Sequence, residues 1–156
     1  MAEKKEFKNR FSWSFSRDNA FNTCKRKYYY SYYGSWGGWN KDADELSKKL
    51  YLLNKMSSLP MLAGTIVHDE VERTLKAVRY GRKADIVKSK ENVIKVFKQS
   101  WSQSKNKEWK DNPKWKTNLF EHFYNQKPTD QALLDIRDLM LDSVDGFFAS
   151  DSYRFI

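Results

Sequence analysis

The sequence has few of the residues that form disulfides or turns, and it has no long apolar run. It has one cysteine, Cys24, so no disulfide can form within the chain, which agrees with a reducing compartment. No run approaches the roughly 20 apolar residues that a membrane span needs, and residues 1–10 lack the apolar core of a signal peptide. We therefore expect a soluble cytoplasmic protein with no membrane partner.

Glycine and proline are also scarce, with six and three residues in a chain of 156. Long stretches without turn residues, together with few β-branched residues, predict a mainly α-helical chain. Aromatic residues make up 16% of the sequence, which is enough apolar surface for a core and excludes a disordered tail. We expect one mostly helical domain over residues 1–156.

The net charge of +9 is unevenly distributed. Residues 1–127 carry a net charge of +13, whereas residues 128–156 carry −4. A polyanion such as nucleic acid would therefore meet the first part of the chain and avoid the last predicted helix.

Capping residues and apolar periodicity predict helices over residues 16–34, from Asp42 or Asp44 to residue 53, and over residues 60–80, 84–105 and 129–148. The segment 106–128 is rich in lysine and tryptophan, and we expect a loop or mobile flap with a short helix at 119–124. Residues 152–156 alternate polar and apolar side chains like the start of a β-strand. A lone strand has no partner, so we expect the chain to be the N-terminal part of a longer protein.

Two local patterns carry the strongest functional signal. The first is Ser14-x-Ser16 followed by Phe21-x2-Cys24-x-Arg26-x-Tyr28, and the second is Gly64-x3-His68 with Glu72 one turn later. In this order they resemble the N-terminal part of RecB-type nucleases of the PD-(D/E)XK superfamily, over about residues 12–80. Departures are Lys25 and Asp18, where that family usually has proline and leucine.

The resemblance implies the helical N-terminal portion of an α/β nuclease that hydrolyses DNA with Mg²⁺ or Mn²⁺. It implies that His68 is a metal ligand, while the central carboxylate and the (D/E)xK pair lie outside these residues, so this chain alone holds no complete catalytic set. Gly64 lets a backbone or phosphate approach one turn before His68, and Glu72 can orient the imidazole. The alternative is a helix-face histidine satisfied by Glu72, and His122 is interpreted as structural.

Cys24 has two main interpretations. In a subset of the family, the equivalent cysteine is one of four ligands to a [4Fe-4S] cluster, but the other three thiolates are not in this chain. The favoured interpretation is a small buried side chain in an apolar stripe with Phe21, Tyr28 and Tyr32.

Cations alternate with aromatic residues in two places. Lys25, Arg26, Lys27 and Tyr29 form the first group, and the Lys/Trp-rich segment around Lys110 and Trp115 forms the second. Cations contact phosphates and aromatic rings stack on unpaired bases, so both groups are candidate DNA-binding residues. The alternative is that the aromatic rings only pack on neighbouring helices.

Three hypotheses follow for the function. The first is the N-terminal region of a RecB-type, metal-dependent DNA nuclease that works with a helicase or another DNA-processing protein. The second is a non-catalytic helical nucleic-acid-binding module, and the third is an interaction domain whose basic surface meets an acidic protein.

Overall fold

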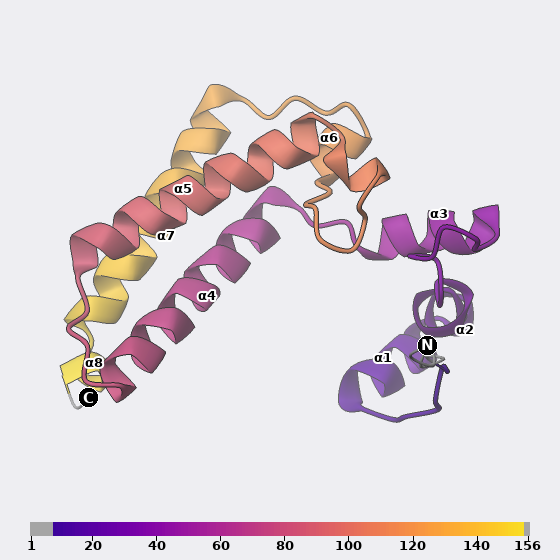
Figure 1. Cartoon of the computed structure of the whole chain (residues 1–156), viewed down its shortest axis with the longest axis horizontal. Helices are drawn as coiled ribbons and strands as arrows, with labels where there is room; N and C mark the ends of the chain where they lie inside the picture. Colours follow the sequence, from indigo (N-terminus) through magenta and orange to yellow (C-terminus); the bar gives the residue numbers. More distant parts are fainter. Residues whose placement is uncertain (1–7, 155–156) are drawn as a thin grey trace, which may run out of the picture. The chain divides into compact units, whose positions relative to one another are not determined.

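A computed structural model describes residues 8–154 and divides the chain into two compact units, Met1–Lys55 (unit 1) and Met56–Ile156 (unit 2). Both units are built from helices, which confirms the predicted mainly α-helical fold (Figure 1). No helix in residues 8–154 has the length and apolarity to cross a bilayer. A single domain over residues 1–156 stays a prediction.

The described part of unit 1, residues 8–55, contains four helical elements, namely α1 (Phe15–Thr23), α2 (Lys25–Tyr29), the π-helix η1 (Tyr30–Gly34) and α3 (Glu45–Asn54). Of the two caps that the sequence allows, Asp44 caps α3, where its side chain accepts the backbone N–H of Ser47 over 2.9 Å. The predicted uninterrupted helix over residues 16–34 is wrong. It starts earlier, after Ser14, whose hydroxyl accepts the N–H of Arg17 over 3.3 Å, and it breaks at Cys24.

The break at Cys24 has a local cause. Its backbone is extended, with φ −163° and ψ 107°, so it ends α1 and begins α2. Its N–H donates to the Ala20 carbonyl over 3.0 Å, while its Sγ accepts the N–H of Lys27 over 3.4 Å. Asn22 and Thr23 precede the break, and both are weak helix formers.

An aromatic cluster around Tyr28 forms the centre of unit 1. Tyr28 is 8% exposed, and its ring lies 5.3–6.1 Å from four other rings, those of Trp13, Phe21, Tyr32 and Tyr33. The turn after η1 packs tightly on α3. A Cβ placed on Gly38 would lie 2.2 Å from the Ser47 carbonyl oxygen, so only glycine fits there.

Unit 2 is organised by three long helices, α4 (Leu59–Arg79), α5 (Ile86–Lys105) and α7 (Asp130–Ala149), which lie side by side (Figure 1). Side chains of Ser58, Asp85 and Thr129 cap their N-termini. The predicted helices over 60–80, 84–105 and 129–148 are therefore confirmed. Their shared core consists of Leu59, Leu62, Ala63, Ile66, Val93, Leu119, Met140 and Val144.

The connection between α5 and α7 contains the 3₁₀-helix η2 (Glu108–Lys110) and the predicted short helix, α6 (Phe120–Phe123). The interpretation of this segment as a mobile flap is wrong, because it is anchored in the core. Leu119 is fully buried and Trp109 is 5% exposed. The backbone of Ser57 donates to Asn118 over 3.0 Å and accepts from Phe120 over 2.9 Å.

The predicted strand at the end of the chain is not formed by residues 151–154. Asp151–Arg154 form a short helix, α8, and the ring of Tyr153 packs 4.8 Å from that of Phe148. Residues 151–154 therefore pack as a helix on α7. Residues 155–156 lie outside the described residues.

Candidate nucleic-acid interface

The first predicted DNA-binding group lies together on α2. Only Tyr28 of this short helix is buried, so the side chains on either side of it face solvent. We call the exposed residues Lys25, Arg26, Lys27 and Tyr29 the α2 surface. Within residues 8–154, none of its three cations pairs with a carboxylate. Lys25 instead lies over the Phe21 ring, with Nζ 5.5 Å from the centroid.

The aromatic member of the α2 surface is accessible. Tyr29 is 56% exposed, and its ring stacks on Tyr33 with 6.4 Å between centroids and 17° between planes. Tyr30, which begins the π-helix, is 40% exposed. The run of tyrosines thus divides into Tyr28, which packs in the core, and rings that reach solvent.

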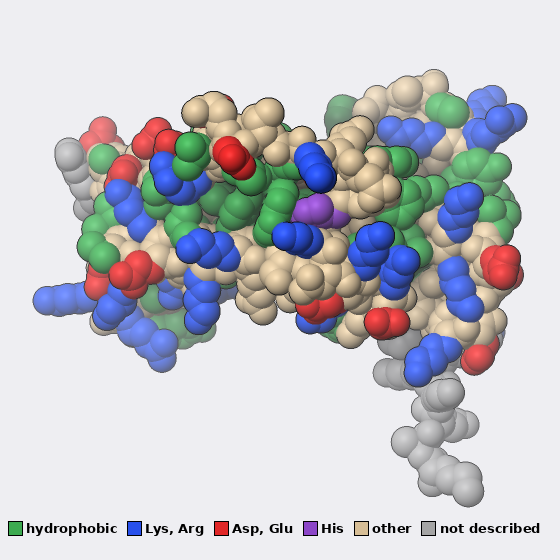
Figure 2. Space-filling model, turned by 90° about the horizontal axis from the view of Figure 1, so that it is seen from above, with side chains coloured by type: hydrophobic (Ala, Val, Ile, Leu, Met, Phe, Trp, Pro, Cys, Tyr) green, Lys and Arg blue, Asp and Glu red, His purple; other side chains and the backbone are tan. Residues whose placement is uncertain are grey.

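The second predicted group belongs to unit 2, and its two residues have different surroundings. Trp115 is 74% exposed, and the Lys114 ammonium lies 5.2 Å from its ring centroid. Lys110 is exposed but lies over Trp109, which is buried. On the face of the molecule seen in Figure 2, Lys and Arg side chains are widely spread, with hydrophobic side chains visible between them. Of the two tryptophans, only Trp115 is available to a ligand.

Cys24 is exposed, which corrects its interpretation as a buried side chain. Its thiol takes the role of an N-cap for α2, as described above. Because the chain has no second cysteine, it does not hold an iron-sulfur cluster by itself.

Gly64, His68 and Glu72 lie one turn apart on α4, and all three are exposed. Apart from its chain neighbours and the backbone of α4, no heavy atom of residues 8–154 would lie within 4 Å of a Cβ at Gly64. The Glu72 carboxylate pairs with Lys76 over 2.5 Å, and this contact, with a smaller contribution from the charge of His68, lowers the pKa of Glu72. The predicted trio therefore shares one accessible face.

The buried stripe of α4 does not include Gly64 or His68 and consists of Leu59, Leu62, Ala63, Ile66, Glu70 and Thr74. Val71, Leu75 and Val78 are half-buried at its edge. The stripe includes a carboxylate, which sequence patterns do not place in a core.

Glu70 is 3% exposed and is held by three polar neighbours. Arg73 forms a two-point ion pair with it, and Asn92 Nδ2 donates to its Oε2 over 2.7 Å. Burial alone raises the pKa of Glu70, but hydrogen bonds from Arg73, Ser89 and Asn92 outweigh burial, and the net shift is downward. Glu70 therefore joins α4 to α5 as an ionised group.

The residues present do not fit a divalent cation. Within residues 8–154, no three His, Cys, Asp or Glu side chains come close enough to share a metal ion. His68 and Glu72 offer at most two donors, and Glu72 is already paired with Lys76. The aspartates of α7 face solvent, apart from the half-buried Asp145, which pairs with Lys90 over 2.5 Å.

His122 packs inside unit 2. Its Nδ1 lies 2.9 Å from the hydroxyl of Ser104, and its ring meets Trp101 edge-on with 4.3 Å between centroids. Burial lowers the pKa of His122, so the neutral ring is favoured. This environment suits the structural role expected for it.

Comparison of the chain with protein-family models, with curated proteins and with solved structures found no match.

Proposed function

We propose that the protein binds single-stranded DNA through the α2 surface. The observation that carries this proposal is the exposed ring of Tyr29 beside three cations that have no carboxylate partner within residues 8–154. Phosphates attract the cations, and an exposed aromatic ring stacks on an unpaired base. Trp115, with Lys114 over its ring, offers unit 2 a second contact of the same kind.

The net charge supports an anionic partner. Residues 8–55 carry ten Lys and Arg side chains against four Asp and Glu side chains. A carboxylate beside a cation offsets the attraction of that cation for an anionic ligand, whereas an exposed cation without such a neighbour attracts the ligand fully.

Fluorescence anisotropy with a labelled oligo(dT) tests the proposal. We expect the triple variant Lys25→Ala, Arg26→Ala, Lys27→Ala to bind at least about tenfold more weakly than the wild type. The matched control removes one arginine and two lysines from unit 2, namely Arg82, Lys95 and Lys98, which are all exposed. Equal losses in both variants would mean that only bulk charge matters, and absence of binding by the wild type at low salt would refute the proposal.

A RecB-type DNA nuclease is the second candidate. It is favoured by the exposed line of Gly64, His68 and Glu72 and by the open space beside Gly64. Since these residues alone do not fit a metal ion, cleavage would need further carboxylates beyond those described. The test is DNA cleavage with Mg²⁺ or Mn²⁺ by the product of the complete gene, as wild type and as His68→Ala. Cleavage that His68→Ala leaves unchanged would refute the role of His68.

A further inference from the structure

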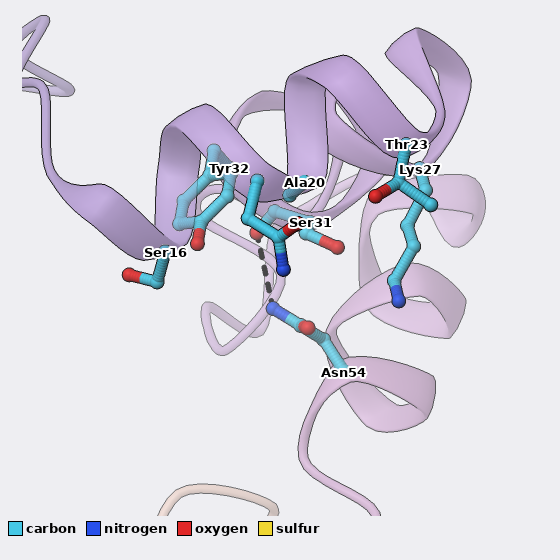
Figure 3. Close-up of a pocket in the computed structure, with 8 residues that line it drawn as sticks. Ser16, Ala20, Thr23, Lys27, Ser31, Tyr32 and Asn54 are labelled. Carbon is cyan, nitrogen blue, oxygen red and sulfur yellow. Dashed lines mark hydrogen bonds between the residues drawn. The ribbon is translucent and has the colours of Figure 1, made fainter.

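Unit 1 contains a polar pocket with a volume of about 300 Å³, formed by α1, α2, η1 and α3 (Figure 3). Apart from Ala20, every lining residue among residues 8–154 carries a hydroxyl, an amide or an ammonium group, and none of them carries a carboxylate. The polar lining residues are Ser16, Asn19, Thr23, Lys27, Ser31, Tyr32 and Asn54. We call this the α1–α3 pocket.

Three of its polar groups are free to bind a ligand. Within residues 8–154, the side chains of Asn19, Thr23 and Lys27 make no hydrogen bond or ion pair with the rest of the chain. They come from α1 and α2, so a ligand in the pocket meets donors from two helices. Figure 3 shows the Lys27 side chain extending from α2 in the direction of Asn54 on α3.

A hydrogen bond joins the wall formed by α3 to the rest of the pocket. Asn54 Nδ2 donates to the backbone carbonyl of Ser31 over 3.0 Å, which joins the end of α3 to η1 (Figure 3). The same carbonyl accepts the hydroxyl of Ser35 over 2.9 Å. The pocket is therefore bounded by connected elements and is not merely a gap beside one helix.

The charges in and around the pocket favour an anion. Lys27 contributes an unpaired ammonium group, and the guanidinium of Arg17 lies 4.4 Å from the ring centroid of the lining residue Tyr32. The one carboxylate of α1, Asp18, accepts a hydrogen bond from Asn22 over 3.0 Å and does not line the pocket. Two cations thus lie at or next to a pocket whose described lining residues include no carboxylate.

We infer that the α1–α3 pocket binds a phosphate group, with Lys27 as its cation and with the Thr23 hydroxyl and the Asn19 amide as neutral donors. Hydroxyl and amide donors beside a lysine are typical partners of phosphate oxygens in nucleic-acid complexes. The inference rests on the proposed function, because Lys27 belongs to both the pocket and the α2 surface. The inference places one backbone phosphate of the bound DNA in the α1–α3 pocket.

The key variant is Thr23→Val, which removes a hydroxyl and keeps the shape and charge of the surface. We expect it to weaken binding of inorganic phosphate and of labelled oligo(dT) by about tenfold each, since each loses a hydrogen bond to a charged group. Lys49→Gln is the control, because Lys49 is exposed on α3 outside the pocket. Phosphate binding is followed by NMR, with shifts expected at the backbone amides of residues 19–31, and circular dichroism checks that each variant is folded.

The outcomes separate the inference from the proposed function. Oligo(dT) binding that Thr23→Val leaves unchanged, with no phosphate-induced shifts at residues 19–31, would overturn the pocket and leave the DNA-binding proposal standing. Phosphate shifts at residues 19–31 that Thr23→Val weakens, without binding of oligo(dT), would support a site for free phosphate and refute DNA binding. Weakening of both ligands by Thr23→Val, but not by Lys49→Gln, supports both.

Discussion

The carboxylate oxygen Oε1 of Glu121 accepts the backbone N–H of Leu59 over 3.0 Å. Leu59 is the first residue of α4, so a side chain 62 residues later satisfies one of the free amides at the start of that helix. The negative charge of Glu121 also interacts favourably with the positive end of the helix dipole. Together with the backbone bonds of Ser57, this contact ties α6 to α4.

Replacing Glu121 tests that link. Glu121→Ala should lower the free energy of unfolding by about 1–2 kcal/mol, because the Leu59 amide loses its acceptor. Glu121→Gln keeps an acceptor oxygen and should lose less. Urea unfolding followed by circular dichroism measures both, with Glu91→Ala on the exposed face of α5 as the control. Equal stability of the alanine variant and the wild type would show that the contact contributes nothing.

Because the buried Glu70 carboxylate is hydrogen-bonded as an ionised group, its protonation in acid should lower the stability of the fold. The pKa of Glu70 in the folded protein lies below the ordinary value of about 4.3. As the pH falls, Glu70 is therefore protonated in the unfolded chain before it is protonated in the folded protein. The stabilisation by Glu70 is therefore present above about pH 4.3 and is lost as the pH falls through the folded pKa. Glu70→Gln should be less stable at pH 7 by about 1–3 kcal/mol, since a neutral amide pairs poorly with Arg73.

The measurement is the free energy of unfolding of both proteins between pH 7 and pH 3. We expect the difference in the free energy of unfolding between the wild type and Glu70→Gln to become smaller as the pH falls. A difference of constant size would contradict an ionised Glu70 in the folded protein.

Two glycines should respond in opposite directions to alanine. A Cβ at Gly38 would lie 2.2 Å from the Ser47 carbonyl oxygen, so Gly38→Ala should destabilise unit 1 by at least about 2 kcal/mol. Gly64 lies inside α4 with open space around it, so Gly64→Ala should stabilise by about 0.5–1 kcal/mol. Thermal unfolding compares the two. A loss of stability in Gly64→Ala would mean that the space beside this residue is occupied.

The sequence predicted the long helices well because their signals are local. Ser58 and Thr129 each accept an amide three residues later, and Gly81, with φ 72°, follows the end of α4. The buried face of α4 could not be read in the same way, because both sides of the helix carry apolar residues. The buried face includes Glu70, whose partner Asn92 lies on α5 and cannot be located from the sequence.

The candidate site was predicted in part for the same reason. The exposed cations of α2 follow from a local cluster of charged and aromatic residues, which the sequence displays directly. The α1–α3 pocket brings Thr23 together with Asn54, and that meeting depends on how α3 folds back on η1. The burial of Trp109 beside the exposure of Trp115 likewise depends on tertiary packing.

The two tryptophans of the connection between α5 and α7 should behave differently. Trp109→Ala should cost about 3–5 kcal/mol, because a buried ring is lost, whereas Trp115→Ala should change stability by less than about 0.5 kcal/mol. Urea unfolding measures these losses, and iodide should quench the fluorescence of Trp115 more strongly. Similar destabilisation by both substitutions would contradict the exposure of Trp115.

The salt dependence of single-stranded DNA binding tests the central claim most directly. The logarithm of the association constant falls with the logarithm of the salt concentration, with a slope of about −0.7 for each phosphate contacted on a single strand. If Lys25, Arg26 and Lys27 each contact a phosphate, replacing all three with alanine should make the slope shallower by about 2. An unchanged slope would show that these side chains contact no phosphate and would contradict DNA binding through the α2 surface.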